Sequence, residues 1–195
     1  VRLPVKYVVN GNLLTQVVFN KGKVGRTRVA LLNPGFVYEY QTVEAGPAFV
    51  ELFKESAARF NLPEASIKLS GQAACPCVID GKAMQMVMNN LIDNAVKYSD
   101  GPPRISMRLS HTRRHVVIDF SDKGIGIAPA ELDKITSKFY RVQKNRWDNS
   151  MGLGLSIVSY ILKLHDTTLT IESTLGIGST FGFSLENLID KHKKP

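Results

Sequence analysis

Residues 81–99, "GKAMQMVMNNLIDNAVKYS", predict one long helix with two chemically different faces. One face is polar and carries Asn90, Asn94 and Lys97, at positions i, i+4 and i+7. Because asparagine is a poor helix former, two asparagines on one helix face need an explanation. The other face is an apolar stripe at helical spacing, made of Met84, Val87, Met88, Leu91 and Ala95.

The polar face suits a site for a metal ion and phosphate groups. A side-chain amide offers a neutral carbonyl oxygen, which is a suitable ligand for a hard cation such as Mg²⁺ when phosphates already supply negative charge. Lys97, one turn beyond Asn94, would meet those phosphates as a point charge. The alternative is that Asn90 and Asn94 are ordinary asparagines, solvated or hydrogen-bonded in the core.

A second unusual stretch, "DKGIGIA", begins at Asp122, at the end of a strand that reads as buried. A buried carboxylate is costly unless a donor faces it, and the exocyclic amino group of adenine is such a donor. Gly124 and Gly126 permit a positive φ or the close approach of a flat base, with Ile125 and Ile127 as apolar walls. The alternative is a simple Asp-Lys-Gly turn between a strand and a helix.

A third stretch, "SMGLGLSIV", places Gly152 and Gly154 directly before an apolar helix. A helix N-terminus presents unpaired N–H groups and a positive dipole end, and glycines let phosphate oxygens come close to them. The polar residues 143–150 would then form a mobile lid over the nucleotide. Tight packing of the helix start explains the same glycines without a ligand.

The last predicted hairpin turns at "LGIG". Gly176 and Gly178 suit such a turn. Ser179 or Thr180, which follow it, would bond waters beside a base. A purely structural role explains these residues as well.

The spacing of apolar residues elsewhere predicts an α+β fold. Helical periodicity covers residues 45–60 and 152–165, and a proline at a helix-opening position predicts a short helix over 129–140. Helices combined with hairpins rather than crossovers indicate a layer of helices on one face of a mixed sheet. The predicted strands are 66–71, 75–80, 104–112, 115–122, 167–174 and 179–186.

In their order, these features resemble the N, G1, F, G2 and G3 boxes of bacterial sensor histidine kinases. The set comprises an Asn-x-x-x-Asn helix, a D-x-G-x-G turn, the aromatic pair of "KFYR", a G-x-G helix start and a G-x-G-S-T-F hairpin, within residues 37–187. The resemblance implies the Bergerat-type ATP-binding fold shared with gyrase-type and mismatch-repair ATPases. That fold is a two-layer α/β sandwich in which ATP lies between helices and sheet, under a lid.

The resemblance also assigns the phosphate end of the site. It makes Asn94 the Mg²⁺ ligand, with Asn90 as its companion. It places Lys97 and Tyr98 on the nucleotide side of the N box and lets Arg141 reach the γ-phosphate, so that Asn90, Lys97 and Arg141 carry the catalytic roles. The remaining F-box and G2-box matches are Phe139, Tyr140, Gly152, Leu153 and Gly154.

For the base end, the resemblance makes Asp122 the acid that holds adenine. It places Gly124, Gly126 and Ile127 beside the base, and makes Thr180 the G3-box threonine near adenine.

The resemblance further bears on the reaction. In the hydrolysing branches of the superfamily a glutamate on the N-box helix is the general base, and the matching residue here is Asn90, which does not accept a proton at neutral pH. We therefore expect MgATP binding and transfer of the γ-phosphoryl group to a histidine on a separate dimerisation domain of the same protein. The signalling partner would be a response regulator. None of the histidines here has a phosphoacceptor context; they are His111, His115, His165 and His192.

Two departures from the family pattern leave an alternative open. The lid ends in "NSMGLGL", with Ser150 and Met151 in place of small flexible residues. The glycine pair that usually follows the G2-helix histidine is Asp166-Thr167. The alternative function is a nucleotide-gated interaction module with weak or no kinase activity, and a hydrolysing clamp is disfavoured by Asn90.

Composition adds limits on class and partners. The 195 residues are 44% hydrophobic and 22% charged, which is enough to bury a core. The net charge of +8 is concentrated in residues 1–36, which hold six Lys or Arg and no acid. Nucleic acid, anionic lipid or an acidic partner would fit this charge, but solvated strand edges explain it too, and no nucleic-acid partner is expected.

The chain divides into three predicted parts: a basic strand-rich segment over 1–36, an ATP-binding domain over 37–190 and a tail over 191–195. No run of about 18 apolar residues predicts a membrane span. The start at Val1 suggests a fragment, so we expect a cytoplasmic domain with any membrane anchor outside it. Cys75 and Cys77 are expected to be free thiols.

Overall fold

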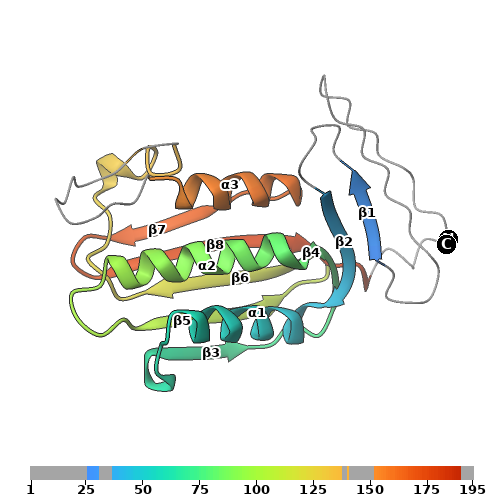
Figure 1. Cartoon of the computed structure of the whole chain (residues 1–195), viewed down its shortest axis with the longest axis horizontal. Coiled ribbons are helices and arrows are strands. Elements are labelled where there is room, and N and C mark those ends of the chain that lie inside the picture. Colours follow the sequence, from blue (N-terminus) through green and yellow to red (C-terminus); the bar gives the residue numbers. More distant parts are fainter. Residues whose placement is uncertain (1–25, 31–36, 138–139, 141–151, 190–195) are drawn as a thin grey trace.

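The computed structural model describes residues 26–30, 37–137, 140 and 152–189. Most of the basic segment 1–36, the predicted lid, Phe139 and Arg141 lie outside this range. Within it the chain forms two sheets and three α-helices (Figure 1). None of the described helices is long and apolar enough to cross a membrane.

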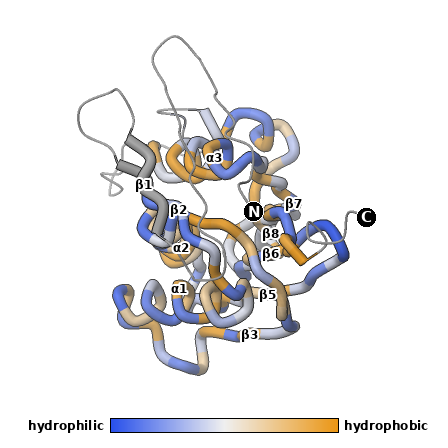
Figure 2. The backbone as a smooth tube through the Cα atoms, turned by 90° about the vertical axis from the view of Figure 1, so that its right-hand side faces the viewer, coloured by the Kyte–Doolittle hydropathy of each residue, from blue (hydrophilic) through white to orange (hydrophobic). Residues whose placement is uncertain are grey.

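The larger sheet is mixed and has the order β3-β5-β6-β8-β7. Its β3–β5 pair is parallel, and its other pairs are antiparallel. Figure 1 and Figure 2 show the three helices on one face of this sheet, so the predicted two-layer α+β architecture is confirmed. The five strands are β3 (Ile67–Gly71), β5 (Ile105–His111), β6 (His115–Asp122), β7 (Thr170–Thr174) and β8 (Gly178–Glu186).

The helices are α1 (Ala45–Arg59), α2 (Gly81–Lys97) and α3 (Gly154–Leu164). Their apolar faces pack on the sheet, and Figure 2 shows hydrophilic and hydrophobic residues alternating along α1. The predicted stripe of α2 is buried along its whole length. Burial of each large apolar side chain stabilises such a core by roughly 2–3 kcal/mol.

Aromatic contacts join α1 to the middle of the sheet. The ring centroids of Phe53 and Phe120 lie 6.1 Å apart, and those of Phe49 and Phe183 lie 6.0 Å apart. Both pairs are tilted or edge-on, which is the preferred geometry for aromatic rings. These contacts fix α1 against β6 and β8, two paired strands in which the last residue of β6 lies opposite the second residue of β8.

A smaller sheet of order β1-β2-β4 closes one end of the molecule. It contains β1 (Arg26–Ala30), β2 (Val37–Glu44) and β4 (Pro76–Asp80), all antiparallel. Strand β1 lies in the predicted N-terminal segment 1–36 and pairs with β2, which follows that segment. The predicted domain boundary at residue 36 stays a prediction. Cys75 and Cys77 are free, as predicted, and the structure buries both.

The predicted helix over 129–140 is wrong beyond its first turn. The structure has a 3₁₀ turn, η2 (Pro129–Glu131), followed by hydrogen-bonded turns. Most backbone bonds here span three residues, and the Ile135 N–H to Glu131 carbonyl bond spans four. In these turns, which are tighter than an α-helix, Ile135 is buried and lines the pocket described below.

Candidate functional site

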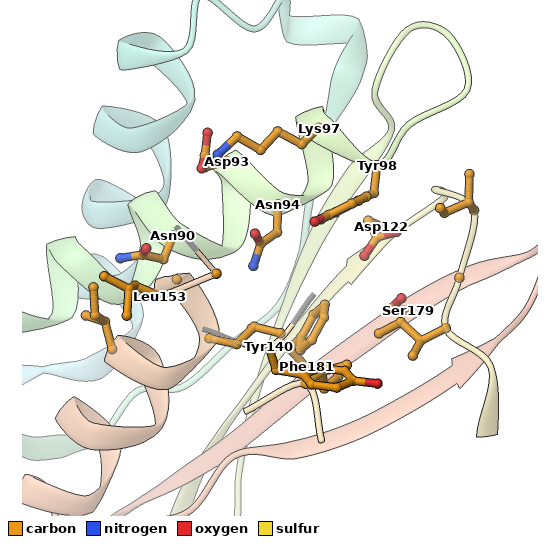
Figure 3. A pocket seen from close by; sticks show the side chains of 18 residues that line it. Asn90, Asp93, Asn94, Lys97, Tyr98, Asp122, Tyr140, Leu153, Ser179 and Phe181 are labelled. Atoms are coloured by element: carbon orange, nitrogen blue, oxygen red, sulfur yellow. Dashed lines mark hydrogen bonds and ion pairs between the residues drawn. The ribbon is translucent and has the colours of Figure 1, made fainter. Parts of the chain in front are cut away.

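A pocket of about 310 Å³ lies between α2, the start of α3 and the ends of β6 and β8 (Figure 3). Its two ends differ in chemistry. Asn90, Asn94 and Lys97 of α2 line one end, and Asp122 and Ser179 lie together at the other (Figure 3). The rest of the lining is Asp93, Tyr98, Ile125, Gly126, Ile127, Ile135, Tyr140, Gly152, Leu153, Gly154, Leu155, Ile157 and Phe181.

The two asparagines of α2 face the first residue of α3. A Cβ placed on Gly154 would lie 3.2 Å from Asn90 Oδ1 and 3.6 Å from Asn94 Oδ1. Asn90 Nδ2 donates to the Met86 carbonyl at 2.7 Å, which orients its carboxamide. Glycine at 154 therefore allows the N-terminus of α3 to approach two amide oxygens, where a larger side chain would crowd them.

Lys97 lines the same end of the pocket but already has a partner. Its ammonium forms an ion pair with Asp93, one turn earlier on α2. Both side chains are about one-third exposed, so solvent screens the pair. Asp93 was not singled out from the sequence, although its i, i+4 spacing to Lys97 was a readable signal.

Asp122 lies at the other end of the pocket, where strand β6 ends. The backbone N–H groups of Gly124 and Ser179 donate to its carboxylate, the former at 2.8 Å. Burial raises the pKa of Asp122 above its ordinary value, and these two hydrogen bonds partly offset that shift. The carboxylate is thus a fixed hydrogen-bond acceptor in a partly desolvated wall.

The two glycines of "DKGIGIA" are required by the protein itself. A Cβ on Gly124 would lie 2.5 Å from the Tyr98 carbonyl oxygen, and Gly124 does not line the pocket. Gly126 lines it, but with φ at +68° its Cβ would lie 2.1 Å from the Thr174 carbonyl oxygen. The missing side chains make room for neighbouring backbone, and the positive φ of Gly126 is one of the two roles predicted for these glycines. That Gly126 also lies beside a base stays a prediction.

Ser179, and not Thr180, faces the pocket. Side chains alternate along β8, so Ser179 and Phe181 point toward the helices while Thr180 points to the opposite face. Thr180 Oγ1 there lies 2.9 Å from Ser121 Oγ. Of the two residues that the sequence left open, Ser179 therefore lines the pocket, and the choice of Thr180 by the resemblance is off by one residue.

The aromatic segment before the lid is partly within the described range. Tyr140 lines the pocket, and its hydroxyl donates to Glu131, which raises the pKa of Tyr140. Phe139 and Arg141 lie outside the described residues, and their predicted roles stay predictions. Gly152 has φ at +67° and lines the pocket together with Leu153.

His165, just after α3, ties that helix to the rest of the fold. Its Nε2 accepts from the Asp80 N–H at 3.0 Å, and its Nδ1 lies 2.8 Å from the Ile161 carbonyl oxygen. Burial lowers its pKa. The next residue, Asp166, has φ at +56°, a left-handed conformation that suits the glycine usual at this place in the family pattern.

Residues 79–188 match the family described as histidine kinase-, DNA gyrase B-, and HSP90-like ATPase, over more than half of the chain. The chain belongs to this family. The matched range contains α2, the "DKGIGIA" turn, α3 and the β7–β8 hairpin, which together line the pocket.

Relatives of this ATPase family include named sensor kinases. Sensor histidine kinase RppB of Synechocystis sp. is 39% identical over 101 residues, 51% of this chain and 22% of RppB. Adaptive-response sensory kinase SasA of Gloeothece citriformis is 30% identical over 143 residues, 71% of this chain and 36% of SasA. The chain therefore spans between about a fifth and a third of the length of these relatives.

Solved structures confirm the ATPase-family fold. The mycobacterial sensor histidine kinase MprB has a TM-score of 0.62 at 22% identity, covering 76% of this chain and 97% of its own. The catalytic domain of histidine kinase ThkA has a TM-score of 0.62 at 20% identity, covering 76% and 98%. At these identities the comparison establishes architecture alone.

The pocket residues fit the nucleotide that an ATPase family binds. Two amide oxygens and a helix start suit phosphates with a hard cation, while a carboxylate between apolar side chains suits a base with an amino group. Among the described residues no three His, Cys, Asp or Glu side chains gather into a metal site.

Proposed function

We propose that this chain is the catalytic, ATP-binding domain of a protein-histidine kinase. The observation that carries the proposal is the two-ended pocket: Asn90 and Asn94 converge on the start of α3, and Asp122 stands at the opposite end beside Ser179. A nucleotide has the same division, with phosphates at one end and a base carrying an amino donor at the other.

In this proposal each residue has a positioning or electrostatic role. Asn94, with Asn90, would ligate Mg²⁺, which supplies neutralisation of phosphate charge when bound. The N–H groups at Gly154 and the Lys97 ammonium would hold phosphate oxygens, with Asp93 holding Lys97 in place. Arg141 would reach the γ-phosphate from the F box.

The transfer step requires no protein nucleophile in this chain. The bond between the γ-phosphorus and its bridging oxygen breaks as a histidine ring nitrogen of another domain bonds to that phosphorus. ADP leaves with the electron pair, and the ring proton goes to solvent. Asn90 stands where hydrolysing relatives of the superfamily have a basic glutamate, so activation of water is not supported.

The proposed setting follows from the named relatives. Sensor histidine kinases suggest a two-component system, with a histidine-bearing dimerisation domain and a response regulator as partners. A cytoplasmic location, with any membrane contact made by other parts of the protein, belongs to the same proposal.

Transfer of label from γ-labelled ATP to a cognate histidine-bearing helical domain tests the proposal. We expect Mg²⁺-dependent label on histidine with the wild-type chain, and a loss of at least about tenfold with Asn94→Ala. The matched control is Asn89→Ala, because Asn89 lies on the same helix but bonds Ser56 of α1 at 2.9 Å, away from the pocket. Binding without transfer would favour the interaction module instead, and phosphate release without an acceptor would favour a hydrolase.

A further inference from the structure

Ser173 of strand β7 lies at the centre of a hydrogen-bond group behind the Asp122 end of the pocket. Its Oγ accepts from the Ile127 N–H at 2.8 Å and donates to the Gly178 carbonyl at 2.9 Å. It also lies 3.0 Å from the Ser179 Oγ. Ser173 does not line the pocket, whereas Ile127 and Ser179 do.

The chemistry of a hydroxyl group fixes the direction of the third contact. A serine hydroxyl has one hydrogen to donate and two lone pairs that accept. A carbonyl oxygen only accepts, so the hydrogen of Ser173 is used by Gly178. The Ser179 hydroxyl is therefore the donor to Ser173, and the two lone pairs of Ser173 are filled by Ile127 and Ser179.

This arrangement determines what the pocket wall offers to a ligand. With its hydrogen directed at Ser173, Ser179 presents acceptor lone pairs toward the pocket. Its neighbour across the strand pair is Asp122, whose carboxylate is also an acceptor. Two adjacent acceptors suit an amino group with two hydrogens and repel a carbonyl oxygen at the same place.

The same group holds the "DKGIGIA" turn against the β7–β8 hairpin. Besides the Ile127 bond to Ser173, the Gly176 N–H donates to the Ile125 carbonyl at 2.7 Å. Gly126 packs against Thr174 between these two bonds. Ser173 thus anchors the loop that carries the apolar walls Ile125 and Ile127.

We propose that Ser173 is a positioning residue that makes the pocket selective for a base with an exocyclic amino group. It does so by holding Ile127 and by keeping the Ser179 hydroxyl hydrogen out of the pocket. The inference rests on the proposed binding of MgATP and adds to it a determinant of base selectivity outside the pocket lining.

The test compares ATP with inosine triphosphate, which carries a carbonyl oxygen in place of the amino group and a hydrogen on the adjacent ring nitrogen. Calorimetric affinities of the full chain for both magnesium complexes should show the wild type preferring ATP by at least about tenfold. Ser173→Ala should reduce this preference by about tenfold, because Ser179 becomes free to turn its donor into the pocket. The phosphates are identical in the two ligands, so the ratio isolates the base.

Thr170→Val is the matched control. Thr170 lies on the same strand, and its hydroxyl likewise donates to a β8 carbonyl, that of Gly182, at 3.0 Å. It faces the opposite side of the sheet, so its removal should leave the ATP preference unchanged. If Ser173→Ala does not fold, Ser173→Cys tests the same point, because a cysteine side chain has a shape similar to that of serine but its thiol forms only weak hydrogen bonds.

Two results would overturn the inference: an unchanged preference in the folded Ser173 variant, including an equal weakening of both nucleotides, or the same change in Thr170→Val. A wild-type chain that binds ATP without preferring it over inosine triphosphate would also overturn it. A wild-type chain that binds neither nucleotide would instead defeat the proposed function, and the inference would fall with it.

Discussion

Gly126 and Gly176 both have a positive φ, yet their surroundings are very different. Gly126 has φ at +68° and faces the Thr174 carbonyl oxygen, which a Cβ would approach to 2.1 Å. Gly176 has φ at +79°, and a Cβ there would meet nothing within 4 Å. The first position therefore combines backbone strain with a steric block, while the second involves strain alone.

This difference predicts unequal costs of the same substitution. Gly176→Ala should lower the free energy of unfolding by about 1 kcal/mol, the usual cost of a left-handed residue with a Cβ. Gly126→Ala should lower it by about 3 kcal/mol, because the backbone at Thr174 must also move. Urea unfolding followed by circular dichroism measures both values, and equal costs would contradict the packing described for the turn.

The C-terminal end of helix α3 is joined to α2 and β2 by contacts of His165, Asp80 and Tyr40, which we call the histidine lock. The His165 ring accepts from the Asp80 N–H, and Asp80 is itself the N-cap of α2, accepting from the Ala83 N–H at 2.9 Å. The Tyr40 hydroxyl of β2 donates to the Leu164 carbonyl at 3.0 Å, and its ring lies 5.2 Å from that of His165. Since α2 and α3 carry the phosphate end of the pocket, this lock helps to set their spacing.

The lock predicts a pH dependence of stability. Burial of the ring lowers the pKa of His165 in the folded chain, while the hydrogen bond to the Ile161 carbonyl and the charges of Asp80 and Asp166 oppose the shift. Between the lowered pKa and about 6.5, the unfolded chain binds a proton that the folded chain does not. Stability should therefore fall as the pH drops below about 6.5, because protonated Nε2 no longer accepts from Asp80.

Melting temperatures between pH 7.5 and pH 5 test this prediction. His165→Gln removes the titrating group and should flatten the pH dependence, although it lowers the melting temperature at pH 7.5. His115→Gln is the control, because His115 is exposed and should leave the dependence as in the wild type. A His165→Gln variant that keeps the full wild-type decline would show that the lock does not titrate.

At the scale of the whole molecule, periodic patterns predicted the architecture well. An element that buries one face repeats its apolar residues at a fixed spacing. This spacing predicted the stripe of α2, the antiparallel β5–β6 pair and the final hairpin. The helix over 129–140 was wrong because local composition does not reveal that Ile135 and Tyr140 are turned toward the pocket. Long-range contacts decide such a segment.

The pocket shows where sequence reasoning stops. Asn90, Asn94, Lys97 and Asp122 line one pocket, while their individual roles stay predictions. The residues alone left Ser179 or Thr180 open and the resemblance chose Thr180, although the apolar alternation of Phe181, Phe183 and Leu185 puts Ser179 on the core face. Ser173 was missed because its bond to the Ile127 N–H joins segments that are far apart in the chain, and no local pattern marks that bond.

Calorimetric titration of MgATP into the wild-type chain, Asp122→Asn and Asp119→Asn tests the central claim most directly. Asp119 lies on the same strand as Asp122 but on the opposite sheet face, paired with Arg108 at 2.9 Å. We predict binding in the micromolar range, a loss of at least about tenfold for Asp122→Asn, and no change for Asp119→Asn. No detectable binding by the wild type, or equal affinities for all three chains, would contradict the assignment of this pocket to ATP.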